Sequence, residues 1–438
     1  MRASVYRGGL RGAAFAFGDL VLALDSETPG RNVALGPKAF LAALPPRTLD
    51  LLDISAAAYL ADLAVRRREE ASWVRSFGVE VAVSDEGFWR NRQGALEYLL
   101  YVLLGDNVGF RFVARDRQDA AAGRRDVPSG VDCVSLLSGG LDSLGGGVAL
   151  AKTGRRPWLV SHSSRCPTTD TAQRRCETAL AALFAAAPQR LVVTLAPSRV
   201  REPAQPFPEE GERESSQRGR SLLFLTAAAG AAHLSGVDDL FVFENGVIST
   251  NLPLSPARLG SMSTRTAHPK VLALFADLAS DVLGRPLRVL NPFQAMTKAE
   301  VVRDVLRPSL RIDDIQATVS CWQAGRTPRP CGGCVPCLVR RIAMRAAGLP
   351  DEAHMIDLLD DPLAHEESDA LSNLVELMML AGSFLDLDDG ELVMRYPQLL
   401  DGADHGAPVE AVIHLYRRFA AEVFEVVPQF PRLAALVG

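Results

Sequence analysis

The sequence predicts an α/β protein in which a parallel sheet with flanking helices follows a small α+β domain and precedes a helical region. From residue 131 onward, short apolar segments alternate with helical segments, a pattern typical of parallel strands joined by right-handed crossovers. The hydrophobic content of 48% and the charged content of 23% suit a packed globular protein. Because 438 residues exceed one ordinary core, we expect three domains, at 1–125, 131–346 and 347–438.

The first domain is expected to mix strands and helices. Its apolar spacing alternates in some segments and follows a helical period in others. The expected elements are strands at 15–24, 77–83 and 108–113 and helices at 47–68 and 94–104. We interpret the polar, Arg/Asp-rich stretch at 114–130 as the linker that leaves this domain.

The second domain supplies the parallel sheet and the third supplies helices. The expected strands of the sheet are 133–137, 158–162, 191–195, 240–243 and 287–290. The helices expected between and after them are 142–152, 169–186, 215–234, 269–283, 298–306, 338–347, 371–385 and 409–427. The segment 197–213 contains four prolines and several charges, and we expect a mobile loop there.

Charge and hydropathy narrow the class of protein. The net charge of −5 disfavours a broad basic surface for nucleic acid. Aromatic residues make up only 6% and form no ladder interleaved with Arg or Lys, which disfavours a platform for single strands. The N-terminus lacks an apolar signal core, and no apolar stretch is long enough to cross a bilayer. We therefore expect a cytoplasmic protein without membrane contact.

The strand at 133–137 runs into a loop of small residues that opens a helix. The loop reads Ser138-Gly139-Gly140-Leu141-Asp142-Ser143. At this edge of a parallel sheet, free backbone N–H groups and the positive end of the helix converge on an anion. Gly139 and Gly140 let the backbone approach phosphate oxygens because neither carries a Cβ atom. The order of strand, loop and helix therefore predicts a phosphate-binding site.

The side chains of this loop suit a nucleotide with a metal ion. Ser138 and Ser143 supply hydroxyl donors. Asp142 would repel bare phosphate, so its expected partner is a Mg²⁺ ion that bridges the phosphates. The loop is not a Walker A motif. It resembles the loop of the PP-loop family (adenine nucleotide alpha hydrolase-like), whose members split ATP into AMP and pyrophosphate while they adenylate a substrate.

Four of the seven cysteines lie within residues 321–337. Clustering of this kind in a reducing cytosol indicates metal ligation rather than disulfides. Thiolates at the spacing C-x9-C-x2-C-x2-C can wrap a tetrahedral ion, and we expect a structural Zn²⁺ site, with an iron–sulfur cluster as the alternative. The predicted ligands are Cys321, Cys331, Cys334 and Cys337.

The combination of this loop with a later four-cysteine cluster resembles the QueC family, the 7-cyano-7-deazaguanine (preQ0) synthases. The resemblance spans roughly 131–346. It is carried by Ser138–Ser143, Arg218-Gly219-Arg220-Ser221, Thr297-Lys298-Ala299-Glu300, Ser320-Cys321-Trp322 and Cys331-Gly332-Gly333-Cys334-Val335-Pro336-Cys337. It implies ATP as a substrate and the adenylation of 7-carboxy-7-deazaguanine, which ammonia then converts through an amide to the nitrile.

The chain also departs from that family. The added N-terminal and C-terminal segments are absent from QueC proper, and the family's Asp-Cys-Arg substrate motif is replaced by other sequences, at 243–246 and 261–269. The extended form looks like the QueC-like proteins of bacterial anti-phage defence, QatC of the four-gene Qat system and its relatives in type IV CBASS. That resemblance implies a protein partner from the same operon, similar to QatB, and a deazapurine coupled to it.

Basic residues outside the loop have two interpretations each. Lys298 stands at a helix start where the carboxyl ends of strands gather an active site, so it either stabilises phosphate or is a solvated lysine. Arg218 and Arg220 each clamp a phosphate or carboxylate, or form ion pairs with the acidic stretch at 209–214. We expect Asp142, Lys298 and Arg220 to be the catalytic residues.

Further residues are candidates for substrate contact. Glu244, with Asn245, ends an apolar strand and either accepts from the guanidine-like edge of a deazaguanine or caps the next turn. Arg265 and His268 bind the substrate or a partner's terminus, although a lone His is more often structural. The resemblance places His162 beside the adenine, through its backbone.

Two other functions use the same features. A tRNA-thiolating PP-loop enzyme also combines this loop with cysteines, but it needs a basic groove and redox-active thiols. A scaffold that only senses nucleotide needs no catalytic residue, and the intact motif at 138–143 disfavours it. Formation of AMP and pyrophosphate distinguishes the enzyme from the scaffold.

Overall fold

The structure is a computed structural model of the chain. It describes residues 2–6, 20–23, 33–67, 74–115, 127–163, 166–197, 207–254, 265–350, 352–365 and 369–437. No helix within these ranges is long and apolar enough to span a membrane.

Two sheets organise the chain. The elements are β1 (Arg2–Tyr6), β2 (Leu20–Ala23), β3 (Val33–Gly36), α1 (Lys38–Ala43), α2 (Pro46–Ala64), β4 (Ser76–Val83), α3 (Glu86–Leu104), β5 (Asn107–Ala114), β6 (Cys133–Leu136), α4 (Leu141–Lys152), β7 (Pro157–Ser163), α5 (Pro167–Ala181), β8 (Arg190–Pro197), η1 (Glu210–Glu212), α6 (Arg220–Ser235), β9 (Asp239–Phe241), α7 (Gly246–Thr250), α8 (Pro269–Leu283), β10 (Arg288–Leu290), α9 (Lys298–Glu300), η3 (Val301–Leu306), α10 (Ile312–Gln316), α11 (Val335–Ala346), η4 (Pro362–His365), α12 (Asp369–Asp386), α13 (Asp389–Arg395), η5 (Pro397–Leu400), η6 (Ala403–His405), α14 (Val409–Val426), η7 (Val427–Gln429) and α15 (Pro431–Val437).

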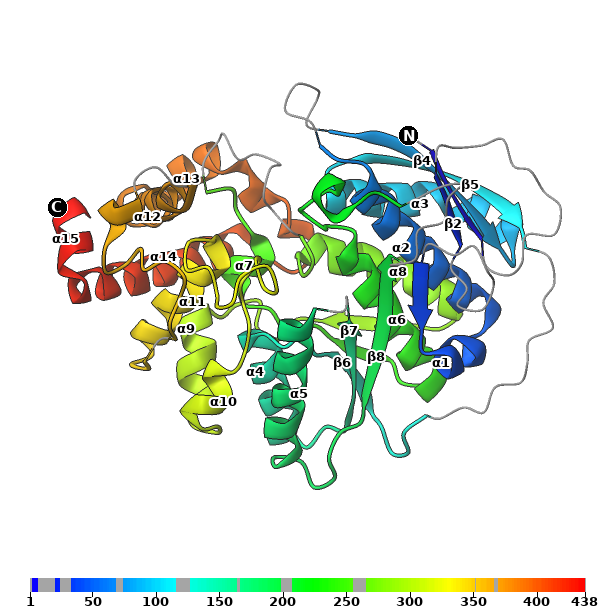
Figure 1. The fold of residues 1–438 in the computed structure, drawn as a ribbon, viewed down its shortest axis with the longest axis horizontal. Coiled ribbons are helices and arrows are strands. Elements are labelled where there is room, and N and C mark those ends of the chain that lie inside the picture. Colours follow the sequence, from blue (N-terminus) through cyan, green and yellow to red (C-terminus); the bar gives the residue numbers. More distant parts are fainter. Residues whose placement is uncertain are drawn as a thin grey trace.

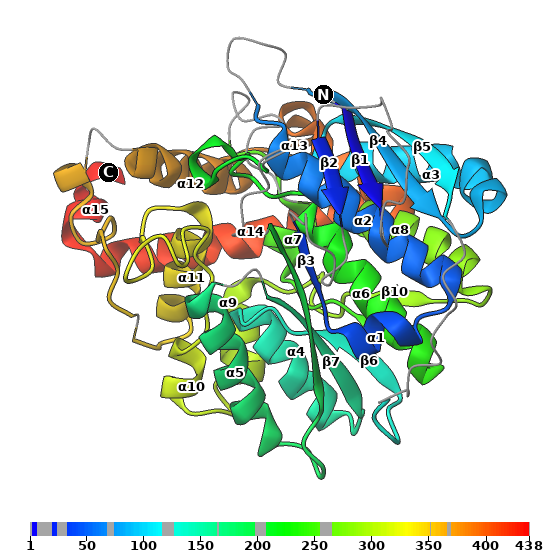
Figure 2. The same ribbon diagram turned by 45° about the vertical axis from the view of Figure 1, so that its right-hand side comes forward.

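The smaller sheet has the strand order β2-β1-β4-β5, and all its neighbours are parallel. The larger sheet has the order β10-β9-β6-β7-β8-β3. Its first five strands are parallel, and β3 closes the edge antiparallel to β8. Figure 1 shows the C-terminal helices α12, α14 and α15 at one end of the molecule and β4 and β5 at the other; Figure 2 shows the same separation from a second angle. The predicted fold class, a parallel α/β sheet with flanking helices and a helical C-terminal region, is confirmed.

The N-terminal part shares its core with the larger sheet. Helix α2 packs against α6, and both helices bury runs of alanine, at 56–58 and 227–229. Small side chains let the two backbones come close. Ser55 Oγ lies 2.7 Å from Thr226 Oγ1 across this contact. One hydrophobic cluster therefore runs from α2 and β4 through α6 to β6 and β7.

A buried ion-pair cluster completes the junction between the two parts. Arg75 lies 2.5 Å from both Asp62 and Asp106, and Arg67 lies 2.6 Å from Asp106. Arg218, just before α6, donates to the carbonyl of residue 104 at 2.8 Å. The aspartates thus pair at close range with Arg67 and Arg75, which offsets the cost of burying these charges.

Two helix starts differ from the sequence prediction by five residues or more. Helix α3 begins eight residues before 94, because Asp85 caps it by accepting from the N–H of Phe88. Helix α6 begins at residue 220 rather than 215. Glu214 accepts from the N–H groups of Arg67 and Ser216, and Gln217 has a φ of 49°, so the chain turns before the helix starts.

Some predicted segments lie partly outside the described residues. Of the strand expected at 15–24, residues 20–23 form β2 and the rest is outside. The described residues also leave out 116–126 of the expected linker and 198–206 of the expected loop. The helix expected at 298–306 starts as α9 and continues in a π-type turn, where the N–H of Arg307 bonds to the carbonyl of Val302.

Candidate nucleotide and metal sites

The loop predicted to bind phosphate joins β6 to α4. Gly140 is the N-cap of α4, and no side chain caps the N–H groups of the first turn, which leaves them available to an anion. Gly139 has a φ of 88°, a conformation that favours glycine. A Cβ atom there would also lie 3.0 Å from the backbone N of Gln173. The loop therefore has the backbone that the sequence predicts.

The two serines of the loop bond to each other. Ser138 Oγ donates to Ser143 Oγ at 3.1 Å and accepts from the N–H of Gly140 at 3.3 Å. Ser143 Oγ in turn donates to the carbonyl of Gly140 at 3.0 Å. Both hydroxyl groups thus lie at the start of α4, where they can turn toward a phosphate.

The loop is supported by two neighbouring residues, Gln173 and Val319, that the sequence analysis did not single out. Gln173 of α5 is buried and donates through Nε2 to the carbonyls of His162 at 3.1 Å and Ser138 at 3.5 Å. The N–H of Val319 donates to the carbonyl of Gly139 at 2.9 Å. The supporting role of Gln173 could not be predicted from the sequence, because its hydrogen-bond partners come from other elements.

Asp142 lies at the centre of a buried polar cluster. Lys298 Nζ, from α9, donates to Asp142 Oδ2 at 2.5 Å. Asn245 Nδ2, at the N-cap of α7, donates to the same oxygen at 3.0 Å and to Glu244 Oε1 at 3.3 Å. Lys298, Asp142 and Asn245 are each at most 6% exposed. The structure therefore brings together four residues that the sequence singled out.

The pKa values of the two carboxyl groups in this cluster are shifted in opposite directions. Burial raises the pKa of Asp142, but the charge of Lys298 and the hydrogen bonds it receives lower that pKa below its usual value overall. Burial and the negative charge of Asp142 raise the pKa of Glu244 well above its usual value. Asp142 Oδ1 is buried and accepts no hydrogen bond from an N–H group of the described residues, and the carboxyl of Glu244 hydrogen-bonds to Asp142 when it is protonated. One lysine therefore balances Asp142, and Glu244 favours its protonated form.

Local interactions position the members of the cluster. Asn291 holds the backbone of Glu244 by accepting from its N–H at 3.2 Å and donating to its carbonyl at 2.9 Å. Thr297 and Glu300 form a capping box that starts α9 at Lys298. Lys298 is thereby fixed at the first position of its helix.

His162 lies in β7, and Arg220 is close enough for its charge to act on the His162 ring. The His162 ring packs edge-on against Phe224 and Tyr59, and its Nε2 lies 3.2 Å from the carbonyl of Leu195. Burial and the charge of Arg220 lower the pKa of His162 to about 3. Arg220 is exposed. The ring of His162 is thus neutral and packed into the core, while its carbonyl faces Gln173.

Three predicted substrate residues have contacts away from the Asp142 cluster. Arg218 lies in the buried ion-pair cluster, where burial and the charge of Arg67 lower its pKa to about 10. Arg265 pairs with Asp401 at 3.2 Å. His268 caps α8 by accepting from the N–H of Lys270, and burial lowers its pKa to about 3.

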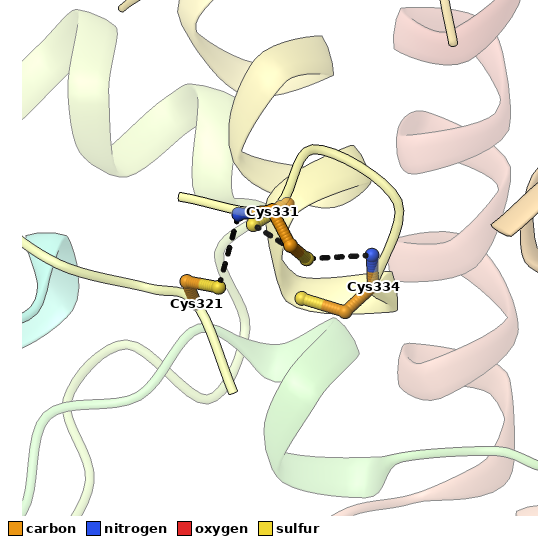
Figure 3. Close-up of side chains that lie close together, drawn as sticks. Cys321, Cys331 and Cys334 are labelled. Atoms are coloured by element: carbon orange, nitrogen blue, oxygen red, sulfur yellow. Dashed lines mark hydrogen bonds between the residues drawn. The ribbon is translucent and has the colours of Figure 1, made fainter. Parts of the chain in front are cut away.

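The four clustered cysteines converge before and at the start of α11. Their sulfur atoms all lie within 4.8 Å of one another, close enough to share a single tetrahedral ion. The N–H of Cys331 donates to Cys321 Sγ and that of Cys334 to Cys331 Sγ, each at 3.3 Å; Figure 3 shows these side chains turned toward one another. Four thiolates with N–H donors behind them fit Zn²⁺.

The four-cysteine cluster packs against the C-terminal region. Gly332 has a φ of 83°, and a Cβ atom there would lie 2.1 Å from the carbonyl of Ile356. Asn373 of α12 donates to the carbonyl of Gly333 at 2.8 Å. The cluster thus links the larger sheet to the C-terminal region.

A parallel sheet with a Ser-Gly-Gly-x-Asp-Ser loop at its carboxyl edge, followed by a four-cysteine cluster, defines a PP-loop type of α/β protein. Comparison with known proteins narrows this class. Residues 132–348 match the family model described as the queuosine biosynthesis protein QueC. This range contains the loop, Lys298 and all four cysteines.

Relatives of known name agree with this match. A 7-cyano-7-deazaguanine synthase of Xanthomonas axonopodis pv. citri (strain 306) is 33% identical over 137 residues, which is 31% of this chain and 56% of that protein. One of Nitrosococcus oceani is 32% identical over 134 residues, 30% of this chain and 54% of the relative. The chain spans about half the length of the curated relatives it matches. The predicted resemblance to QueC is confirmed for this segment.

Proposed function

We propose that the chain is an ATP-dependent enzyme that acts on a 7-deazaguanine-type substrate, 7-carboxy-7-deazaguanine or the related nitrile preQ0, and that it adenylates the carboxylate of the former. The observation that carries this proposal is the buried ion pair between Asp142, in the loop at 138–143, and Lys298. Both residues lie in the segment that matches the QueC family model. The pair supplies a carboxylate and a cation at the site where the sheet and the helix end favour phosphate.

We assign the loop to ATP. Ser138, Gly139, Gly140, Leu141 and Ser143 are proposed to hold the phosphates through N–H and hydroxyl groups. His162 is proposed to border the adenine with its backbone.

Asp142 is the proposed ligand of Mg²⁺. The residues fit this ion, because Asp142 Oδ1 is a buried carboxylate oxygen that accepts no hydrogen bond from an N–H group of the described residues, the carboxyl of Glu244 is its neighbour, and carboxylate oxygen is a ligand that Mg²⁺ prefers. Glu244 is proposed to ionise and join Asp142 when the ion is present. The ion would neutralise phosphate charge.

The proposed reaction transfers AMP to a carboxylate. A carboxylate oxygen of the substrate attacks the α-phosphorus of ATP, the bond from that phosphorus to the bridging oxygen breaks, and pyrophosphate leaves. Lys298 is proposed to offset the negative charge that develops on the phosphates, and Arg220 is proposed to do so from the exposed start of α6.

Substrate contacts are proposed for residues around this site. Glu244 and Asn245 already contact the cluster, and Glu244 has oxygens suited to the N–H groups of a guanine-like edge. Arg265 and His268 are proposed to bind the substrate or a partner's terminus, and each would exchange a present contact to do so. Arg218 would have to leave the buried ion-pair cluster.

We further propose that the chain acts in bacterial anti-phage defence, as a protein similar to QatC, and that it couples the activated base to a protein from the same operon. The motivating features are the segments outside 132–348 and the replaced substrate motif. In the coupling step an amine of the partner would attack the acyl carbon, and AMP would leave.

Product analysis tests the reaction class. The protein is incubated with ATP, Mg²⁺ and 7-carboxy-7-deazaguanine, and nucleotides are separated by chromatography. We expect AMP and pyrophosphate, and a loss of about 100-fold or more in the variant Asp142→Asn. Formation of ADP, or of AMP at equal rates in both proteins, would refute the proposal.

The intact mass of the partner tests the coupling. Each neighbouring gene product is added to the same mixture and weighed by mass spectrometry. An added mass equal to the deazapurine acyl group is expected. Accumulation of free nitrile with an unchanged partner mass would exclude coupling and leave adenylation standing.

A further inference from the structure

Helix α12 carries apolar side chains on its outer face as well as on its inner face. The inner face is buried, with Leu377 and Phe384 at its centre. On the outer face, Val375, Met379 and Leu385 are 47%, 57% and 50% exposed. Surface helices normally place polar residues there. Figures 1 and 2 show α12 at the outer edge of the C-terminal helices.

The outer apolar residues form one continuous stripe. Residues 371, 375, 378, 382 and 385 follow at alternating intervals of four and three residues, which places them on a single side of a helix. Met379 lies one turn after Val375, at the edge of that side. Leu371 and Met378 are half-buried at the margins of the stripe. Among the described residues of this chain, nothing covers it.

A glycine lies in the middle of the stripe. A Cβ atom added to Gly382 would have nothing within 4 Å, so no described contact within the chain requires a glycine there. Glycine weakens a helix interior relative to alanine. A glycine on an exposed helix face allows another backbone to come close. Gly382 therefore points to a contact made from outside the chain.

The charges around the stripe favour a basic partner. The charged residues of α12 itself are all acidic, namely Asp369, Glu376 and Asp386. Asp388, Asp389 and Glu391 follow at the start of α13, where Asp389 pairs with Arg417 of α14 at 2.8 Å. A second copy of this face would bring two acidic rims together, and an anionic lipid surface would be repelled. Lys and Arg flanking an apolar stripe would be attracted.

We infer that the outer face of α12 binds an amphipathic helix of a partner protein, with an apolar stripe flanked by Lys and Arg. Helix-in-groove recognition uses anchors at this spacing, and methionines such as Met378 and Met379 adapt to the shape of an apolar partner. This docking surface lies outside the nucleotide loop and needs no catalysis.

A synthetic peptide tests the surface. The probe is a fluorescent helical peptide of about 18 residues with Leu at the spacing of one face and Lys elsewhere; a matched peptide carries Glu in place of Lys. Binding to the full chain is followed by fluorescence anisotropy. We expect the Lys peptide to bind at least about tenfold more tightly than the Glu peptide.

Variants locate the contact. The double variant Val375→Ser with Met379→Ser is expected to weaken binding of the Lys peptide about tenfold or more. Gly382→Ala should also weaken it, although alanine favours the helix and leaves the fold at least as stable, as thermal unfolding will show. Ile312→Ser, at another exposed apolar position (42%) in α10, should leave binding unchanged.

Other results would overturn the inference. Equal binding of the Lys peptide to the wild type and the double serine variant would show a contact made by charge alone. A dimer in sedimentation that the double variant dissociates would assign the face to a second copy. Binding to phosphatidylglycerol vesicles that the double variant abolishes would assign it to lipid.

Discussion

At the residue scale, the site depends on contacts between residues that are far apart in the sequence. The motif at 138–143 and Lys298 could each be recognised from local patterns. Their ion pair could not, because 156 residues separate Asp142 from Lys298 and no periodicity encodes such a pairing. The second interpretation of Lys298, a solvated surface lysine, does not match its 6% exposure.

The Asp142–Lys298 pair makes a prediction about stability. Lys298→Met leaves a buried carboxylate without its cation, and we expect the free energy of unfolding to fall by about 3 kcal/mol, measured by urea unfolding. The double variant with Asp142→Asn removes the charge as well and should recover most of that loss, yet form no AMP. A double variant as unstable as Lys298→Met would contradict a paired charge.

Glu422 makes a prediction about pH. It is 8% exposed and accepts from Thr297 Oγ1 at 2.6 Å, and burial raises its pKa from 4.5 to about 7. The folded state therefore holds this proton more tightly than the unfolded state, and stability declines as pH rises from 4.5 to 7.

Glu422→Gln keeps the hydrogen bond and removes the titration. We expect the variant to gain on the wild type by up to about 3 kcal/mol across that window, measured by chemical unfolding on both sides of it. The exposed Glu425→Gln on the same helix is the control and should show no such gain. A constant difference at all pH values would disprove the assignment.

At the element scale, the sequence predicted most elements, while the starts of α3 and α6 depended on the cap at Asp85 and on the turn at Glu214 and Gln217. Helix α4 contains three consecutive glycines, at 145–147, that pack closely against their neighbours. A Cβ atom at Gly146 would lie 2.0 Å from Phe243, and one at Gly147 would lie 2.4 Å from Leu180.

Gly146→Ala should therefore destabilise the protein although alanine favours helices. The added methyl group has to displace a buried ring beside the loop, and we expect a loss of about 2 kcal/mol in thermal unfolding. Gly94→Ala in α3 has open space around the new Cβ atom and should gain up to about 1 kcal/mol. Equal effects at both positions would argue against tight packing of α4.

At the scale of the whole molecule, the sequence predicted the order of the parts but not how they join. The shared core of α2 and α6, the pairing of β3 with β8 and the contact of the cysteine cluster with α12 all depend on surfaces far apart in the sequence. The division into three domains at 125 and 346 stays a prediction.

The cysteine cluster makes a prediction at this scale. We expect one zinc ion per chain by mass spectrometry of metals, and its removal by a chelator should increase hydrogen exchange both at 321–337 and in α12, because Asn373 bonds to Gly333. Cys334→Ser should do the same. Iron with sulfide in place of zinc, or exchange confined to the cysteine loop, would contradict this view.

The antiparallel strand β3 has a consequence for dividing the chain. It covers the hydrogen-bonding edge of β8, a strand whose Leu191, Val193 and Leu195 are buried. A fragment trimmed to the segment that matches the family would expose this edge and invite pairing with other chains. The N-terminal segment thus covers a strand edge of the segment that matches the family model, and isolating that segment would require a substitute for four residues that lie about a hundred positions upstream of it.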